Sequence, residues 1–265
     1  MTEFMKYPRT PHLIGSRLQP GDEELDQVDL GDLRGGTLVF EEKIDGANAA
    51  LSFRADGSLQ LQSRGHVFRG GGREAQFALF KAWAGAHRHR FHPVLGARYI
   101  VFGEWCYAKH TIFYDRLPHY FLEFDVFDRD EKLFLPTPAR WRLLEGLPIV
   151  PVPVVHEGAV RDGLGLRKLV GSARFKSAHW KAALNEAAAA TGQSPDRIAA
   201  ETDPSDLAEG LYLKHEDGDR VIGRYKFIRE SFLQAVVTSG SHWQDRPIVP
   251  NRLAPGVDIF AGAGA

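Results

Sequence analysis

The sequence has little of what marks a secreted, membrane-spanning or disulfide-rich protein. Cys106 is the single cysteine among 265 residues, which excludes an intramolecular disulfide and a cysteine-rich metal site. No run of about 18 or more apolar residues occurs, so no membrane span is expected. The first residues lack the apolar core of a signal peptide. A cytoplasmic location is the default that follows.

An excess of charge of one sign is also lacking. Lysine and arginine number 33 against 34 aspartates and glutamates, which leaves a net charge of −1. This balance argues against a protein whose main task is to coat nucleic acid, although it is compatible with local basic patches. The length allows one well-buried core, with at most a small appendage.

Hydrophobic patterning predicts an antiparallel α+β domain. Asp56-Gly57 is typical of a tight hairpin, and Pro151 and Pro153 indicate an edge strand or an extended connection. A helical stripe places Phe77, Phe80 and Trp83 in the core. The expected strands are 37–42, 47–53, 59–62, 99–106, 120–127, 211–214 and 220–228, and the expected helices lie at 73–86, within 177–200 and near 230–237.

Strands paired by hairpins, with helices between the groups, favour antiparallel sheets over a doubly wound parallel sheet. We expect one main domain over residues 37–232. Residues 1–36 are expected to pack on or near that domain, and residues 233–265 to form a short, loose tail without a full second domain.

A lysine in a turn is the first sign of chemistry. Glu42-Lys43-Ile44-Asp45-Gly46 ends one predicted strand and precedes the next, so the lysine can project into a cleft. A lysine near its ordinary pKa of about 10.4 is protonated and not nucleophilic. Burial, or positive charge from a metal ion or arginines, would favour the neutral amine. Gly46 would let the backbone approach a nucleotide closely.

Taken alone, such a string also fits an ordinary surface turn, but five further segments follow it in a specific order. They are Ser63-Arg64-Gly65, Phe102-Gly103-Glu104, Phe121-Leu122-Glu123-Phe124-Asp125, Glu209-Gly210-Leu211-Tyr212-Leu213-Lys214 and Arg224-Tyr225-Lys226. With the Lys43 turn they resemble the six motifs of the covalent nucleotidyltransferases, the superfamily of DNA ligases, RNA ligases and mRNA-capping enzymes. The resemblance spans residues 37–232 and implies an ATP-grasp-like ligase adenylation domain built on antiparallel sheets.

Within this superfamily the sequence is most similar to the RNA ligases that seal nicks in duplex RNA. Asn48 stands where that branch carries an asparagine needed for RNA joining, and the Phe-Gly-Glu and Phe-Asp forms of two motifs are similar to that branch. The resemblance implies ATP and Mg²⁺ or Mn²⁺ as cofactors. It also implies RNA with nicked or broken ends as substrate, and an end-processing kinase, phosphatase or other repair protein as a partner.

The resemblance further implies a role for each charged motif residue. Lys43 attacks the α-phosphorus of ATP to form lysyl-AMP, AMP passes to a 5′-phosphate, and a 3′-hydroxyl then displaces it. Lys226 and Arg224 neutralise the α-phosphate, and Lys214 contacts that phosphate or a metal-bound water. Glu209 is the metal-site carboxylate, because Mg²⁺ takes oxygen ligands and keeps several waters.

Other motif residues are assigned by the resemblance to the nucleoside. Glu104 faces a ribose hydroxyl, and Arg64 faces the ribose or a nearby phosphate. Phe124 either stacks on adenine or belongs to the core. Glu42 accepts from the adenine amino group, which would favour ATP over GTP.

Four residues near these motifs receive structural interpretations instead. Asp45 is expected to order the turn, and Cys106 to be a small buried hydrophobe. His110 and His215 are expected on the surface, because phosphoryl transfer through lysine needs no histidine.

Two departures and three alternatives remain with this interpretation. Arg224 replaces the lysine usual in RNA ligases, and the sizeable C-terminal domain of related ligases is expected to be nearly absent. Residues 1–36, a second polypeptide or another enzyme that holds the substrate would then take its place. The alternatives are a small ATP-dependent DNA ligase, a capping guanylyltransferase, which Glu42 disfavours, and a degenerate ligase that binds nucleotides or ends without joining them.

Overall fold

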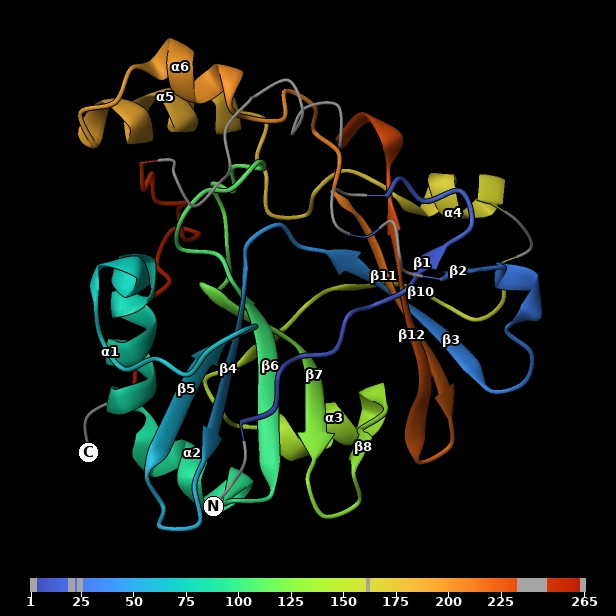
Figure 1. Ribbon diagram of the computed structural model, residues 1–265. Helices are drawn as coiled ribbons and strands as arrows, with labels where there is room; N and C mark the ends of the chain where they lie inside the picture. Colours follow the sequence, from blue (N-terminus) through green and yellow to red (C-terminus); the bar gives the residue numbers. More distant parts are fainter. Residues whose placement is uncertain (1–3, 19–21, 23–25, 161–162, 233–246, 263–265) are drawn as a thin grey trace.

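Two sheets dominate the computed structural model, which describes residues 4–18, 22, 26–160, 163–232 and 247–262. Most neighbouring strands in each sheet pair antiparallel (Figure 1). The first sheet has the order β10 (Val154–Glu157), β3 (Thr37–Lys43), β11 (Gly210–Asp217), β12 (Arg220–Ile228), β1 (His12–Leu13) and β2 (Gln27–Val28). The second has the order β5 (Leu59–Ser63), β4 (Ala47–Phe53), β6 (Tyr99–Trp105), β7 (Phe121–Asp128) and β8 (Leu133–Phe134), with β9 (Val150–Pro151) paired to β7.

Helices flank the two sheets, and α3 contacts both of them through Arg140. In Figure 1, α1 and α2 cover the second sheet, and α4 lies beside the first. The helices are η1 (Leu30–Asp32), η2 (Gly72–Phe77), α1 (Ala78–Ala86), α2 (Arg88–Leu95), α3 (Thr137–Leu144), α4 (Gly163–Leu169), α5 (Trp180–Ala190) and α6 (Pro195–Ala200), where η marks a 3₁₀ helix. The predicted α+β class with antiparallel sheets is therefore confirmed.

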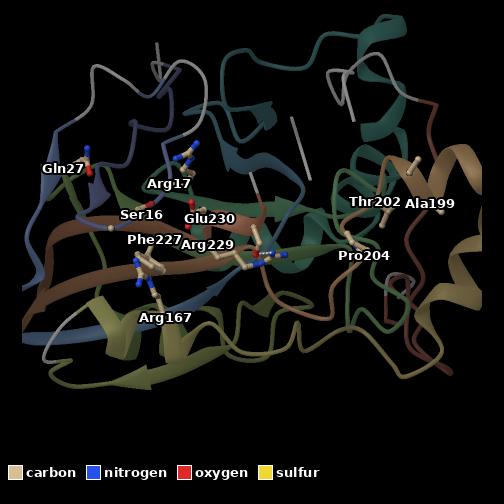
Figure 2. A pocket seen from close by; sticks show the side chains of 13 residues that line it. Ser16, Arg17, Gln27, Arg167, Ala199, Thr202, Pro204, Phe227, Arg229 and Glu230 are labelled. Carbon is tan, nitrogen blue, oxygen red and sulfur yellow. Dashed lines mark hydrogen bonds between the residues drawn. The ribbon is translucent and has the colours of Figure 1, made fainter. Parts of the chain in front are cut away.

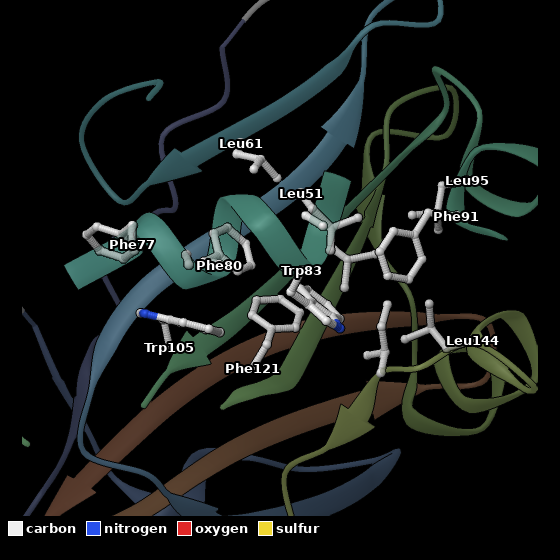
Figure 3. Close-up of a cluster of buried hydrophobic side chains, with 14 of the residues drawn as sticks. Leu51, Leu61, Phe77, Phe80, Trp83, Phe91, Leu95, Trp105, Phe121 and Leu144 are labelled. Atoms are coloured by element: carbon white, nitrogen blue, oxygen red, sulfur yellow. The ribbon is translucent and has the colours of Figure 1, made fainter. Parts of the chain in front are cut away.

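An aromatic cluster joins α1 to the second sheet. Phe80 and Trp83 of α1 pack on Phe121 of β7, with ring centroids 5.3 and 5.5 Å apart (Figure 3). Phe77 is buried in the same cluster. The predicted core role of these three α1-region aromatics is thus confirmed, although the first part of the predicted helix is a 3₁₀ turn.

Strand alternation places apolar and charged side chains on opposite faces of the first sheet. On one face, Phe40 of β3 and Leu213 of β11 belong to a buried apolar cluster. On the other face, Glu41 of β3 contacts Lys214 of β11 and Arg140 of α3. The charged face is turned toward the second sheet, because Lys214 also reaches Asp125 of β7.

The N-terminal segment is part of the first sheet. β1 runs parallel to β12, with His12 opposite Lys226, and β2 pairs with β1. Tyr7 donates a hydrogen bond to Asp125 on the second sheet. Residues far from the predicted motifs thus contact both sheets.

Three local predictions need correction. The prediction of a loose tail is wrong for residues 247–262, because Val249 and Asn251 are 1% exposed and Asn251 bonds to the loop around Tyr107. His110 and His215 are buried rather than on the surface. The helix predicted near residues 230–237 lies mostly outside the described residues. No helix in the described ranges is long and apolar enough to cross a membrane.

Candidate functional site

Lys43 lies at the end of β3 beside a buried carboxylate. Its Nζ is 2.8 Å from Oε1 of Glu209, and 25% of the lysine side chain is exposed against 3% of the glutamate. Lys43 pairs with Gly210 across β3 and β11, which brings the preceding Glu209 next to it. A Cβ at Gly210 would be 1.9 Å from the Phe227 carbonyl oxygen, so only glycine fits at this crossing.

The surroundings of Lys43 favour its protonated form in the protein without ligands. Burial acts to lower the pKa of Lys43, but Glu209 and Glu104 outweigh it and raise the pKa above its ordinary value. The protein without ligands therefore does not favour the neutral amine, and the positive charge expected from a metal ion or arginines stays a prediction. Lys43 is an ammonium there, and a nucleophilic role requires added positive charge or loss of its pairing with Glu209.

Glu104 and Asn48 face Lys43 from the second sheet. They are direct cross-strand partners on β6 and β4. Burial raises the pKa of Glu104 to about 8, against the opposing effect of Lys43, and Glu209 raises it further. Burial likewise raises the pKa of Glu209 to about 7. Oδ1 of Asn48 is buried without a hydrogen-bond partner in the described chain, so it has acceptor capacity left for a ligand.

The turn after Lys43 is held by Asp45, as predicted. The Asp45 carboxylate accepts hydrogen bonds from the backbone N–H groups of Thr111, at 2.7 Å, and Ile112, at 2.6 Å. Gly46 has a structural reason of its own, since a Cβ there would be 2.9 Å from the carbonyl oxygen of Trp105. Close packing of the turn on β6 is sufficient to require this glycine.

Lys226 is paired by the N-terminal segment. Its Nζ contacts Oδ2 of Asp22, and each side chain is 13% exposed. Asp22 also bonds to Nε2 of the buried His12 at 3.0 Å, and Nδ1 of His12 lies 2.7 Å from Oγ of Ser16. Burial lowers the pKa of Lys226, with Lys43 acting in the same direction, so the two lysines are electrostatic neighbours.

Lys214 and Arg224 are bound to carboxylates between the sheets. Lys214 is fully buried, with its Nζ 2.7 Å from Oε2 of Glu41 and 3.6 Å from Oδ1 of Asp125. Arg224 lies 3.3 Å from Oδ2 of Asp125 and over the ring of Phe134. The predicted phosphate contacts of Lys214 and Arg224 stay predictions. To form such a contact, either side chain would have to give up one of these ion pairs.

Apart from Glu104, the predicted nucleoside residues lie in three separate places. Glu42 lines a cavity of about 230 Å³ and accepts hydrogen bonds from the backbone N–H of Arg174, and burial raises its pKa to about 7. Phe124 is partly buried, edge-on to Tyr7 at 5.4 Å. Arg64 is exposed directly after the end of β5, next to the strand position that pairs with Ala49.

Sequence reasoning missed several residues of the charged face. Arg140 is fully buried and bridges Glu41 of the first sheet and Glu123 of the second, with an Nη1–Oε1 distance of 2.8 Å to Glu123. Alternation could have found Glu41, because it stands two residues before Lys43 on the same face. Asp22 and Arg140 lie in no recognisable motif, so only the tertiary fold reveals them.

The residues around Lys43 fit a divalent ion that keeps much of its water. Mg²⁺ commonly uses one or two carboxylates together with several waters. Glu104 and Glu209 are two desolvated carboxylates, and the cations named among the main influences on their pKa values are Lys43 and Lys226. In the described part of the chain, no group of three or more His, Cys, Asp or Glu side chains could hold a metal.

Comparison with known proteins gives one family and one fold. The model of the RNA ligase family matches residues 36–228. No curated protein matches the sequence significantly. A Naegleria gruberi RNA ligase variant with ATP and Mn is 17% identical, with a TM-score of 0.52, over 79% of this chain and 54% of its own. The same ligase with PPi is 18% identical, with a TM-score of 0.52, over 77% and 53%.

A further Naegleria gruberi RNA ligase variant with ATP and Mn is 16% identical, with a TM-score of 0.51, over 85% of this chain and 61% of its own. The chain thus spans a little over half the length of these structures. At such identities the likeness shows a shared fold.

Proposed function

The chain belongs to the RNA ligase family, and on that premise we propose that it joins RNA 3′-hydroxyl and 5′-phosphate ends with ATP through a lysyl-AMP intermediate. The observation that carries the proposal is the position of Lys43, beside Glu209 and facing Glu104, at the junction of the two sheets. A buried lysine with two acidic neighbours can become a nucleophile when added positive charge offsets them.

Glu209, with Glu104 beside it, would hold Mg²⁺ or Mn²⁺. The bound ion would supply positive charge that favours the neutral amine of Lys43 and offsets charge on the triphosphate. Glu209 would also accept a hydrogen bond from Nζ of Lys43 and thereby aim the amine. Glu104 would accept a hydrogen bond from a ribose hydroxyl when it does not bind the ion.

The chain's cations would orient the α-phosphate. Lys226 shares the face of β12 that is turned toward the second sheet, and its ammonium has three donors of which Asp22 needs one. The remaining donors would bind a phosphate oxygen. Phosphoryl transfer depends mainly on such positioning and on charge stabilisation, with the attacking and leaving groups in line.

For the nucleoside we propose that Glu42 accepts from the adenine amino group, with Phe124 stacked on the base and Arg64 at the ribose or a nearby phosphate. What supports this role is that Glu42 is a buried carboxylate beside a cavity, where it accepts hydrogen bonds from the backbone N–H of Arg174. Lys214 and Arg224 would act in the same step. Lys214 would do so through its ion pair with Glu41 on β3.

The RNA-specific part of the proposal rests on Asn48. Its Oδ1, buried and without a partner among the described residues, lies across from Glu104, where it would accept from the RNA end during AMP transfer and joining. We propose further that the protein seals nicks in duplex RNA and cooperates with an end-processing enzyme. Its proposed location is the cytoplasm. The adenylation unit would comprise residues 37–232, with residues 1–36 packed against it.

The test is covalent labelling with α-labelled ATP and Mg²⁺, followed by a denaturing gel. We expect acid-labile label on the wild-type protein and none on Lys43→Ala. Lys81→Ala is the matched control, because Lys81 is similarly exposed and also pairs with a glutamate, Glu74. Absence of label on wild-type protein stripped of AMP would refute the proposal.

Nicked duplexes then identify the acceptor. We expect sealing when RNA supplies the 3′-hydroxyl side of the nick, and little sealing of an all-DNA nick. Equal sealing of both would replace the RNA assignment by a DNA ligase.

A further inference from the structure

A large cavity lies beyond the predicted motifs, at the edge of the first sheet. It has a volume of about 1240 Å³ and is bounded by the loop after β1, the end of β12, α4 and the segment that follows α6 (Figure 2). Gln27 of β2 also lines it. Most of these elements lie outside the six motifs, so the resemblance assigns nothing to the cavity.

The cavity continues the row of strand ends that begins at Lys43. Lys43 pairs with Gly210, and Gly210 pairs with Ile228 on β12. The backbone N–H of Arg17 then donates to the Ile228 carbonyl at 3.1 Å. Neighbouring strands lie about 4.8 Å apart, which puts the Arg17 backbone roughly 15 Å from that of Lys43 along the sheet edge. A polynucleotide whose end reacts at Lys43 covers that distance within a few nucleotides.

Two exposed arginines line the cavity from different segments. Arg17 and Arg167 are exposed, and neither forms an ion pair with a residue in the described ranges. In Figure 2, Arg17 belongs to the loop after β1 and Arg167 belongs to α4. Arg229 is different, because it is held by Asp203 and the Ala208 carbonyl. The guanidinium fork of Arg17 and Arg167 matches phosphate oxygens.

The rest of the lining favours backbone recognition over base recognition. Among the described lining residues, Glu230 is the single acid and Phe227 the single aromatic. Phe227 is 2% exposed, so its ring cannot stack on a base. The hydroxyl of Ser16 is used by His12 and by the Ile228 N–H. Charge therefore supplies the recognition, and the whole chain's net charge of −1 makes this local positive region distinct.

We propose that this cavity binds the phosphodiester backbone of the RNA strand next to its reactive end, with Arg17 and Arg167 as the phosphate contacts. The inference rests on the proposed function, since it names where that substrate lies. It assigns sequence-tolerant binding, because phosphate contacts position a strand without reading its bases. The triphosphate of ATP and free pyrophosphate share the phosphate chemistry, so the test includes them as separate probes.

The variant is Arg17→Ala combined with Arg167→Ala. Its matched control is Arg142→Ala combined with Arg220→Ala, two exposed arginines on α3 and at the opposite end of β12. The probe is a 5′-phosphorylated single-stranded RNA of about ten nucleotides, with binding followed by fluorescence anisotropy at several salt concentrations. We expect roughly tenfold weaker binding and a salt slope smaller by about 1.4, near 0.7 for each phosphate that an arginine no longer neutralises.

Labelling of Lys43 with ATP should be unchanged in the variant, and so should inhibition by pyrophosphate. RNA affinity and salt slope equal to those of the control would overturn the proposal. A raised KM for ATP, or weaker inhibition by pyrophosphate, would also overturn it in favour of free phosphates as the ligand. Because binding is read without catalysis, a wild-type protein that binds RNA but takes no label would refute the proposed function and leave this site standing.

Discussion

At the scale of single residues, Lys43 combines a reactive position with an unreactive resting state. Glu209 and Glu104 raise the pKa of its amine against the effect of burial, so under the proposed function the protonated amine would become nucleophilic only when a metal-bound nucleotide adds positive charge. The same carboxylates would bind the ion that releases the amine. Activation of the nucleophile and arrival of the substrate would therefore be coupled at two side chains.

Asn48 allows the labelling step to be separated from the joining step. Asn48→Ala removes an acceptor that has no partner in the described chain, so folding should change little. We expect ATP labelling within about twofold of wild type and RNA joining reduced at least about tenfold, which corresponds to about 1.4 kcal/mol. The measurement is single-turnover labelling beside joining of a nicked RNA duplex. Equal loss in both reactions would place Asn48 at the nucleotide instead.

Glu42 gives the stability a specific pH dependence. Burial raises the pKa of Glu42 from 4.5 to about 7, so the folded state binds this proton more tightly than the unfolded state. The resulting stabilisation is present below about pH 4.5 and is lost as pH rises through about 7. We expect Glu42→Gln to be more stable than wild type at pH 8, by up to about 3 kcal/mol, and nearly equal near pH 4.5.

Urea unfolding at both pH values checks this expectation, with the exposed Glu131→Gln as control. A gap between Glu42→Gln and wild type that is the same at both pH values would contradict a raised pKa of Glu42. The same variant tests base recognition, because loss of a carboxylate should reduce the preference for ATP over GTP in the labelling assay.

At the scale of elements, the N-terminal segment contributes side chains to the charged face. β1 aligns His12 with Lys226, and the imidazole, Asp22 and the lysine form a connected chain of polar contacts. Removing Asp22 would leave the Lys226 ammonium partly buried without its carboxylate, which lets the side chain leave its position. Asp22 is thus a positioning residue in the proposed reaction.

A double-mutant cycle tests that role. Asp22→Ala should slow ATP labelling roughly tenfold in the wild-type background, and should have almost no further effect when Lys226 is already alanine. Asp22→Asn, which keeps an acceptor, should lie between wild type and Asp22→Ala. A loss of similar size in both backgrounds would indicate that Asp22 only stabilises the fold.

Local patterns predicted the strands and several helices because period and turn chemistry are local. β-prone runs and the Asp-Gly turn predicted the strands that the structure has at Thr37–Lys43, Ala47–Phe53 and Leu59–Ser63. Two-residue strands such as His12–Leu13 carry no period, and their pairing with β12 depends on tertiary contacts. The order of the motifs likewise predicted that Lys43, Glu104 and Glu209 share one site. It gave no indication of Asp22 or of the cavity at Arg17.

At the scale of the whole molecule, Arg140 ties the two sheets together. Its guanidinium is fully buried between Glu41 of the first sheet and Glu123 of the second. Breaking a buried ion network by removing one partner usually costs more than the network contributes, because the remaining charges stay buried. The position of Lys43, two residues after Glu41, depends on the same junction.

Arg140→Leu should therefore destabilise the protein by about 3–5 kcal/mol. Urea unfolding followed by tryptophan fluorescence measures the loss, and Arg142→Leu, exposed on the same helix, is the control. Adding Glu123→Gln to Arg140→Leu should recover part of the stability, since the orphaned carboxylate disappears, whereas Glu41 keeps its pairing with Lys214. No recovery would mean that packing of the arginine stem, rather than charge, dominates.

The lone thiol of Cys106 has a practical consequence for following this protein in solution. It is fully buried, and burial raises its pKa well above the ordinary value, so thiol-directed reagents find almost no thiolate in the folded protein. A cysteine introduced at an exposed position, such as Arg142→Cys on α3, would then be the single labelling point. One fluorophore could report on docking of an RNA strand without prior removal of the native cysteine.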